Sequence, residues 1–391
     1  MKSKAISLIV TMVFALCATP SISHAANDAQ ARIKPTVDAA IQPVMAKYRI
    51  AGMAVGVIVD GEPHVFNYGV ASKQTGQPVT RNTLFELGSI SKTFTATLAA
   101  YAQVNGDLSL SDSTGKYLPS LRGSPFGNNV SLLNLGTHTP GGLPLQVPDD
   151  IHNNDQLLQY FRAWQPAYPP GTQRTYANPG IGTLGLITAK SMGQDFNTLM
   201  QQRVFPALGM TSSYIDVPKA RMADYAQGYS KNDAPIRMAP GVLSSEAYGI
   251  KTTAADMLHF VAENMNPAKL DGKFQRAIID THTGYFKAGV LTQDLIWEQY
   301  PYPVALQTLQ QGNSPAMIFN ATPAVEIKPP QAPRQDVWIN KTGSTNGFGA
   351  YVAFVPQKRL GIVILANRNF PIEARVSVAY QIMTALAGSE H

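Results

Sequence analysis

Cysteine is nearly absent from this chain of 391 residues. The single cysteine is Cys17, and because one thiol cannot close an intramolecular bridge, the fold does not depend on disulfides. Cys17 also lies in an N-terminal segment that we expect to be removed, so the mature chain is predicted to lack a thiol nucleophile. The histidines are scattered without an HExxH or HxH pattern, and we expect no metal and no other cofactor.

Charged residues are also scarce, at 14% of the chain, and the formal net charge is +6. Lys2 and Lys4 lie in the segment expected to be removed, so the mature chain keeps only a small positive charge. The basic residues are neither clustered nor interleaved with aromatic residues. We therefore expect no nucleic-acid partner, and only a weak preference for anionic substrates.

The first 25 residues have the pattern of a signal peptide. Lys2 and Lys4 precede an apolar stretch at 5–18, and Ser23-His24-Ala25 offers small residues at a cleavage site. The apolar run is shorter than the roughly 20 residues that a membrane-spanning helix needs. We therefore expect a cleaved signal, no membrane anchor, and export to the periplasm.

The two ends of the mature chain show strand patterns, and its middle shows mainly helical patterns. Strands are predicted at 53–59, 64–70, 337–342, 349–355 and 361–365. Helices are predicted at 35–48, 155–164, 182–192, 197–208, 253–264 and 372–386, and a surface loop at 310–335. We therefore predict an α/β (α+β) fold with one antiparallel sheet formed by both chain ends and flanked by helices.

We expect residues 26–391 to form a single catalytic unit with two lobes. Residues 26–105 and 325–391 would form the α/β lobe, and residues 106–324 an inserted, mainly helical lobe. The cleft between the lobes is the expected place for an active site.

Ser89-Ile90-Ser91-Lys92 is the first candidate for chemistry. An apolar helical pattern follows Gly88, so Ser89 is expected at a helix start with Lys92 one turn further on the same face. A serine hydroxyl needs a neighbouring base to act as a nucleophile, and a helix start offers N–H groups to an oxyanion. The pattern alone is weak, because Ser113-Thr114-Gly115-Lys116 has the same spacing and either copy could be structural.

Two further short motifs occur once each. Tyr176-Ala177-Asn178 would direct a phenol and an amide toward one site if the segment is extended. Lys341-Thr342-Gly343 lies on a predicted strand, where the glycine lets a substrate backbone approach the strand edge. Taken alone, the first motif could be a turn before Pro179, and the second could hold an ordinary solvated lysine.

Together, the three motifs have the order and approximate spacing found in the penicillin-recognising serine enzymes, and the chain resembles the class C β-lactamases. The resemblance covers nearly the whole mature chain. It extends to the blocks at 85–94, 141–148, 246–249 and 365–367. Tyr-x-Asn at the second motif separates the chain from class A enzymes, which carry Ser-Asp-Asn there.

The resemblance implies a role for each matched residue. Ser89 would be the acylated nucleophile, and Lys92 and Tyr176 would share the role of general base. Tyr176 would also activate the hydrolytic water, with Lys341 supporting its phenolate. The backbone N–H groups of Ser89 and Ser344 would form an oxyanion hole. The residues implied in substrate binding are Gln146, Asn178, Tyr248, Thr342, Asn369 and Arg375.

Four positions depart from the family pattern. His138 stands where tyrosine is common, Asn340 replaces a histidine, Asn346 replaces a glycine, and Ile372 replaces an asparagine. None coincides with a residue that carries the implied chemistry, so we expect that chemistry to be intact. Asn346 should share a strand face with Thr342. It would then either supply the substrate-binding amide missing at Ile372 or contact water only.

We therefore expect a secreted serine β-lactamase that opens the amide of cephalosporins and penicillins and so gives antibiotic resistance. Its partners would be small β-lactam substrates, and the protein would act as a monomer. A DD-peptidase or esterase with the same fold stays open, since it would differ in how fast the acyl-enzyme hydrolyses. A non-catalytic sensor of β-lactams or peptidoglycan also stays open, but it should have lost a catalytic group.

Overall fold

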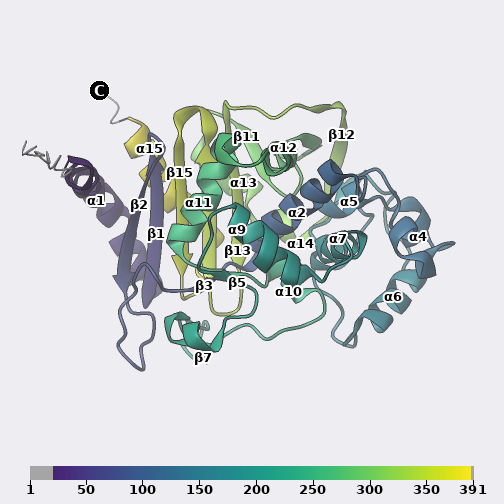
Figure 1. The fold of residues 1–391 in the computed structure, drawn as a ribbon, viewed down its shortest axis with the longest axis horizontal. Helices are drawn as coiled ribbons and strands as arrows, with labels where there is room; N and C mark the ends of the chain where they lie inside the picture. The colour runs from purple at the N-terminus through teal and green to yellow at the C-terminus, as the bar shows by residue number, and fades with distance from the viewer. Residues whose placement is uncertain (1–20, 389–391) are drawn as a thin grey trace, which may run out of the picture.

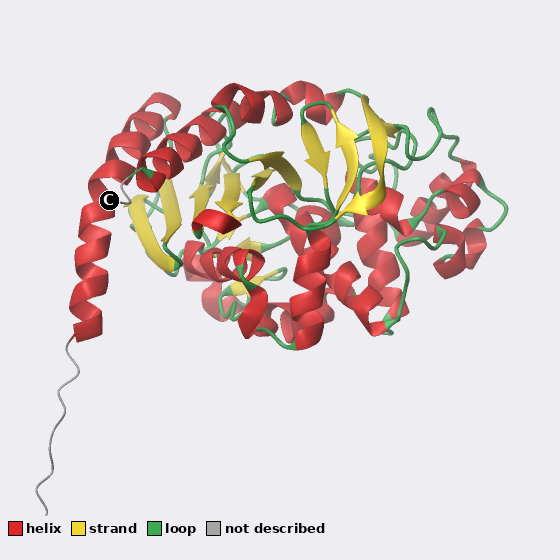
Figure 2. Ribbon diagram, turned by 90° about the horizontal axis from the view of Figure 1, so that it is seen from above, coloured by secondary structure: helices red, strands yellow, loops and turns green. Residues whose placement is uncertain are grey.

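The computed structural model describes residues 21–388, which form a ten-stranded antiparallel sheet covered by helices (Figure 1, Figure 2). In order across the sheet, the strands are β2 (Glu62–Gly69), β1 (Gly52–Val59), β15 (Leu360–Ala366), β14 (Gly349–Val355), β13 (Val337–Ser344), β11 (Glu298–Pro301), β10 (Leu291–Gln293), β9 (Gly284–Ala288), β12 (Thr322–Gln331) and β4 (Gln173–Arg174).

The two ends of the chain meet in this sheet. β1 pairs antiparallel with β15, with Val55 opposite Ile364, and β14 pairs with both β15 and β13. β14 and β15 are buried at every position, because both faces of the sheet are covered there, and they read as continuous apolar runs. The antiparallel fold predicted from both chain ends is confirmed.

Helices cover both faces of the sheet. The terminal helices α1 (Ser21–Tyr48) and α15 (Ile372–Ala387) pack their apolar residues on one face. The other face meets α11 (Ala254–Met265), beyond which lie α2 (Ser91–Asn105), α7 (Asn178–Ser191) and α12 (Gly272–Thr281). Phe94 of α2 stacks on Phe260 of α11 with ring centroids 4.0 Å apart.

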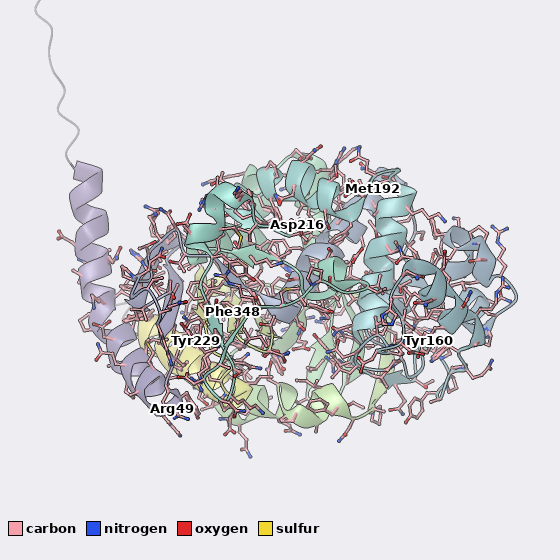
Figure 3. All side chains as sticks on the ribbon, turned by 90° about the horizontal axis from the view of Figure 1, so that it is seen from below. Arg49, Tyr160, Met192, Asp216, Tyr229 and Phe348 are labelled. Atoms are coloured by element: carbon pink, nitrogen blue, oxygen red, sulfur yellow. The ribbon has the colours of Figure 1, made fainter. Side chains whose placement is uncertain are left out.

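Short elements complete the structure. The remaining helices are α3 (Thr114–Tyr117), α4 (Pro125–Asn129), α5 (Leu132–Gly136), α6 (Asn154–Ala163), α8 (Phe196–Leu199), α9 (Phe205–Ala207), α10 (Ser244–Tyr248), α13 (Leu306–Gly312) and α14 (Pro315–Phe319), with a π-helical turn at Met200–Val204. Strands β3 (Phe85–Glu86), β8 (Lys251–Thr252) and β5 (Ser213–Tyr214) form a small sheet, and β6 (Gly228–Tyr229) pairs with β7 (Pro235–Ile236). Side chains fill the space between these layers, and Phe348, labelled in Figure 3, packs edge-on against Phe85.

The structure differs from the sequence prediction between residues 284 and 331. Strands β9, β10 and β11 join the sheet although they fall within the segment 106–324 that was expected to be mainly helical. The surface loop predicted at 310–335 is wrong, because this segment contains α14 and the ten-residue strand β12. β12 is largely exposed, so it lacks the apolar pattern of a buried strand. The boundaries between the α/β lobe and the inserted lobe stay a prediction.

The predicted signal peptide falls mostly on residues 1–20, which lie outside the described residues. Its last five residues belong to the start of α1. Within residues 21–388, none of the helices combines the length and the hydropathy needed to cross a bilayer.

Candidate active site

Ser89 lies at the start of a helix, as the sequence predicts. A 3-10 turn at Gly88–Ile90 leads directly into α2. Gly88 has a φ of 54°, a left-handed conformation that favours glycine. Between Thr83 and Ala102, Ser89 is the only residue that is not buried. The turn therefore presents one hydroxyl to the outside from a rigid, buried support.

The side chain of Lys92 reaches back to this hydroxyl. Its Nζ donates to Ser89 Oγ at 2.9 Å and to the carbonyl oxygen of Ala247 at 2.9 Å, and the residue is fully buried. Burial lowers the pKa of Lys92 to about 8, with the Tyr176 phenol opposing this shift and the charge of Lys341 assisting it. A lysine with such a pKa can take up or release a proton near neutral pH.

Tyr176 completes the cluster from the segment between β4 and α7. Its ring centroid lies 5.3 Å from Lys92 Nζ and 5.0 Å from Lys341 Nζ, and its hydroxyl shares a hydrogen bond with Ser89. Burial alone would raise the pKa of the Tyr176 phenol, but the charges of Lys341 and Lys92 outweigh burial and lower that pKa to about 8. The phenol can therefore lose its proton while in contact with the serine.

Strand β13 brings Lys341 and the backbone of Ser344 to the serine turn. A side chain at Gly343 would collide with the Leu87 carbonyl oxygen, and one at Gly88 would collide with the backbone of Ser344. Two glycines thus allow the strand and the turn to touch through their backbones. This close approach is what an oxyanion hole from the N–H groups of Ser89 and Ser344 requires, and that role stays a prediction.

Two of the predicted substrate-binding residues contact each other. Asn178 Nδ2 donates to Gln146 Oε1 at 2.6 Å, and the backbone N–H of Asn178 donates to the Leu145 carbonyl oxygen at 2.9 Å. Within residues 21–388, the buried Oδ1 of Asn178 has no hydrogen-bond partner, so it is free to accept an N–H group. Tyr248 ends α10 one residue after Ala247, whose carbonyl oxygen binds Lys92.

The end of β13 is supported from behind by Arg375. This guanidinium is fully buried and donates to the carbonyl oxygen of Gly343 at 2.7 Å, to Ser344 Oγ at 2.9 Å and to Asn369 Oδ1. The resemblance implies that Arg375 lies near the substrate carboxylate. The structure places its guanidinium against the backbone and side chain at the end of β13, and its part in substrate binding stays a prediction.

Asn346, which the sequence suggests as a source of the substrate-binding amide missing at Ile372, lies on a different element from Ile372. Asn346 is exposed in the turn after β13, and Ile372 begins α15, where it packs partly buried against the core formed by the terminal helices. Thr342 lies on β13 next to Lys341 and is 9% exposed. Whether Asn346 replaces the amide missing at Ile372 stays a prediction.

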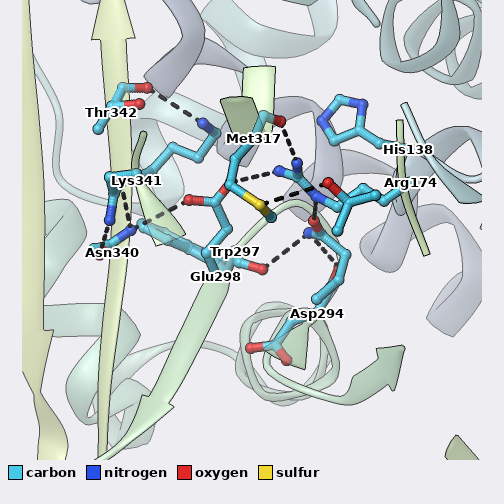
Figure 4. Close-up of polar contacts among 12 residues, drawn as sticks. His138, Arg174, Asp294, Trp297, Glu298, Met317, Asn340, Lys341 and Thr342 are labelled. Carbon is cyan, nitrogen blue, oxygen red and sulfur yellow. Dashed lines mark hydrogen bonds and ion pairs between the residues drawn. The ribbon is translucent and has the colours of Figure 1, made fainter. Parts of the chain in front are cut away.

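A buried polar network around Arg174 and Glu298 lies next to Lys341, and no local sequence pattern marks most of it (Figure 4). Arg174 Nη2 pairs with Glu298 Oε1 at 2.7 Å, and both side chains are almost fully buried. Glu298 Oε2 accepts from Asn340 Nδ2 at 3.3 Å. Arg174 precedes Tyr176 by two residues and Asn340 precedes Lys341 by one, so the network connects the supports of both residues.

The arrangement suits acyl transfer. A partly exposed hydroxyl lies between a lysine and a phenol whose pKa values are both lowered, and two backbones meet where an oxyanion would form. Among residues 21–388, no group of three or more histidine, cysteine, aspartate or glutamate side chains is placed to hold a metal ion.

Comparisons with known proteins identify the family. The β-lactamase family model matches residues 37–387. A β-lactamase from Pseudomonas fluorescens is 52% identical over 354 residues, which cover 90% of this chain and 99% of that protein. The solved structure of a D-alanine carboxypeptidase from Burkholderia cenocepacia is 60% identical, with a TM-score of 0.87 over 90% of this chain and 99% of that chain. A class C β-lactamase solved in complex with cefoxitin is 54% identical, with a TM-score of 0.89 over 91% of this chain and 99% of that chain. The chain therefore belongs to the β-lactamase family and to its class C branch.

Proposed function

We propose that this chain hydrolyses the amide bond of cephalosporins and penicillins through an acyl-enzyme on Ser89. The contact between Ser89, Lys92 and Tyr176 carries the proposal, because it joins a nucleophile to two groups able to accept its proton. As the Ser89 oxygen attacks the lactam carbonyl carbon, its proton passes to Tyr176 or Lys92. The developing oxyanion would be held by the N–H groups of Ser89 and Ser344.

Collapse of this intermediate breaks the lactam C–N bond and leaves an ester on Ser89. The departing nitrogen takes up the proton that the base had accepted, so the base is restored. In the second half-reaction Tyr176 takes a proton from water, the hydroxide attacks the ester carbon, and Ser89 leaves with the proton that Tyr176 had taken up. The Oδ1 of Asn178 would accept the amide N–H of the substrate side chain, and Lys341 with Thr342 would bind its carboxylate.

A D-alanine peptidase activity is the second candidate. It is supported by the likeness to a D-alanine carboxypeptidase at 60% identity. The acylation step would be the same, since a peptide ending in D-alanyl-D-alanine also offers an amide carbonyl beside a carboxylate. The two activities would differ in which acyl-enzyme Tyr176 and water hydrolyse faster.

We also propose that the reaction takes place in the periplasm. A signal peptide in residues 1–25 would direct the chain to the periplasm, where a monomer would destroy β-lactams before they reach their targets and so give resistance. The related proteins named β-lactamase and the cefoxitin-bound neighbour support β-lactams as the substrates.

A chromogenic cephalosporin tests the reaction directly. Ser89→Ala should lower kcat by several orders of magnitude, as loss of a serine nucleophile does in other enzymes. Ser113→Ala is a matched control, because it changes the serine of the second Ser-x-x-Lys copy, where Lys116 pairs with Asp112. Near-normal activity of Ser89→Ala would refute the proposal. A chelator should have no effect on hydrolysis.

Release of D-alanine separates the two candidate activities. The wild-type protein is given a D-alanyl-D-alanine peptide and, separately, the cephalosporin, and kcat/KM is compared. We expect the cephalosporin to be preferred, and a preference for the peptide would favour the peptidase.

A further inference from the structure

His138 contacts the backbone of the two residues on either side of Tyr176, Thr175 and Ala177. Its carbonyl oxygen accepts the N–H of Thr175 at 2.7 Å, and its ring Nδ1 accepts the N–H of Ala177 at 3.3 Å. The two rings also pack against each other, with centroids 4.3 Å apart and planes tilted by 34°. One residue thus contacts the residue before Tyr176, the residue after it and the Tyr176 ring itself.

The backbone that carries His138 is held in an unusual conformation. His138 has a φ of 59°, in the left-handed region that residues other than glycine rarely adopt. The residues on either side are fixed to α5 and to each other. Thr137 Oγ1 donates to the Leu133 carbonyl oxygen at 2.8 Å and lies 2.9 Å from Thr139 Oγ1, and Asn134 Nδ2 donates to Thr139 Oγ1 at 3.1 Å. The imidazole is therefore mounted on a rigid turn.

The ring of His138 has to be neutral in this position. A ring nitrogen that accepts the Ala177 N–H carries no hydrogen, so the ring hydrogen lies on Nε2, which has no hydrogen-bond partner within residues 21–388. The charged groups that face the ring are Arg174 from β4, Lys92 from α2 and Lys341 from β13. Burial lowers the pKa of His138 well below its usual range, and these three cations lower it further. A protonated ring would lose the acceptor and add a fourth positive charge to the cluster.

We propose that His138 is a positioning residue for Tyr176, holding the backbone N–H groups of Thr175 and Ala177 so that the phenol stays between Lys92 and Lys341. This inference rests on the proposed role of Tyr176 as the base. The backbone contact to Thr175 does not depend on the side chain at 138, so substitutions there test the contact to Ala177 and the packing of the ring.

Two variants separate these side-chain contacts. His138→Phe keeps an aromatic ring against Tyr176 but removes the acceptor. His138→Asn removes the ring, offers an oxygen near the place of Nδ1, and tolerates the left-handed backbone. We expect His138→Phe to lower kcat/KM roughly tenfold, because the Ala177 N–H loses its partner and the phenol its fixed place. His138→Asn should stay within about threefold of the wild type.

The pH profile distinguishes positioning from general destabilisation. A phenol that leaves its place between the two lysines regains a pKa closer to that of an ordinary tyrosine. The acidic limb of kcat/KM should therefore move up by at least about half a pH unit in His138→Phe, and should stay in place in His138→Asn. Exchange of the Ala177 amide hydrogen, measured by mass spectrometry on a peptide covering it, should speed up in the first variant only.

His282 provides the matched control. It is a second buried histidine, one of whose ring nitrogens lies 3.0 Å from Asn264 Oδ1, and it packs against Trp297 and Phe354 rather than Tyr176. His282→Phe should lower Tm and leave the pH limb in place. The inference is overturned if His138→Phe keeps the wild-type limb and rate, if His138→Asn loses as much as His138→Phe, or if His282→Phe moves the limb equally.

Failure of this inference differs from failure of the proposed function. A wild-type protein that does not turn over the cephalosporin, or Ser89→Ala that does, refutes the function itself. Normal turnover by Tyr176→Phe overturns the assignment of the base, and the role of His138 with it. An inactive Tyr176→Phe beside a normal His138→Phe overturns the role of His138 alone.

Discussion

The charge of Lys341 acts on both groups that contact the serine. Its Nζ lies 5.0 Å from the centre of the Tyr176 ring. A positive charge at that distance favours the phenolate, and it disfavours a second ammonium at Lys92. The pKa of Tyr176 is thereby lowered against the opposing effect of burial, and the pKa of Lys92 is lowered in the same direction as by burial. One lysine thus makes two neighbouring protons easier to lose.

Lys341→Met tests this effect at the level of a single residue, because methionine keeps the length of the side chain without its charge. The pKa of Tyr176 should rise, so the phenol stays protonated up to a higher pH and cannot accept the proton of Ser89. The acidic limb of kcat/KM should therefore move to higher pH, in addition to any loss of substrate affinity that is independent of pH. The measurement is kcat/KM for a cephalosporin between pH 5 and 10.

Lys287→Met is the control for the loss of one positive charge on the same sheet. Lys287 lies on β9, where its Nζ donates to Thr292 Oγ1. We expect the acidic limb of kcat/KM for Lys287→Met to lie at the same pH as that of the wild type. A slower Lys341→Met with an unchanged limb would restrict Lys341 to binding the substrate.

Among the elements, three strands are joined by one buried carboxylate. Glu298 lies on β11 directly opposite Asn340 of β13, and it pairs with Arg174 of β4. Arg174 also donates to Gln293 Oε1 at 2.7 Å and to the Met317 carbonyl oxygen at 2.8 Å. A buried cation with these contacts depends on its counter-charge, since water cannot replace it.

Glu298→Gln should therefore be strongly destabilising. The amide has nearly the size of the carboxylate but leaves Arg174 without a counter-charge, and breaking a buried pair in this way costs about 3–5 kcal/mol. Denaturant unfolding measures the loss. Glu326→Gln is the matched control, because Glu326 pairs with Lys328 on the exposed strand β12, and its loss should cost less than about 1 kcal/mol. Equal costs for the two variants would mean that the buried pair does not hold the strands.

The sequence predicted those elements whose own residues carry a pattern. β1, β14 and β15 are runs of seven or eight mostly buried residues, and α11 and α15 repeat apolar residues at helical spacing. β10 has three residues and β4 has two, which is too short for any period. β12 is long but largely exposed. The strands that complete the sheet therefore could not be found without the tertiary structure.

The same limit applies to the candidate site. Helical spacing alone places Lys92 beside Ser89, because residues three apart share a face. Tyr176 and Lys341 were matched through motifs, since only the folded sheet brings them together. The pairing of Arg174 with Glu298 joins residues 124 positions apart, and no local pattern marks it. The sequence marks His138 only as a departure from the family pattern, because its contacts with the neighbours of Tyr176 depend on a left-handed backbone.

For the molecule as a whole, the buried His282 and the largely buried Glu246 link stability to pH in opposite directions. Burial lowers the pKa of His282 from 6.5 to about 4, so the stability that its neutral form gives is lost as the pH falls from 6.5 through 4. Burial raises the pKa of Glu246 from 4.5 to about 7. The protonated form of Glu246 is therefore favoured by folding, and this stability is lost as the pH rises from 4.5 through 7.

Glu246 lies on α10 in contact with α2 and α7. The hydroxyl of Thr95 donates to its carbonyl oxygen at 2.6 Å, and a side chain at Gly185 would collide with its Cγ. The carboxyl group of Glu246 therefore lies where its ionised form would lose part of its hydration. Glutamine has the same shape and stays neutral at every pH, so Glu246→Gln keeps the packing and removes the titration.

We expect Glu246→Gln to match the wild type in stability near pH 4.5 and to exceed it increasingly up to about pH 8, where the gain would be at most about 3 kcal/mol. The measurement is the free energy of unfolding of both proteins across this pH range. Glu62→Gln, at an exposed position on β2, makes the same change in net charge and serves as the control. A stability difference that does not change with pH, or one that Glu62→Gln reproduces, would show that burial of the Glu246 carboxyl group does not link folding to pH.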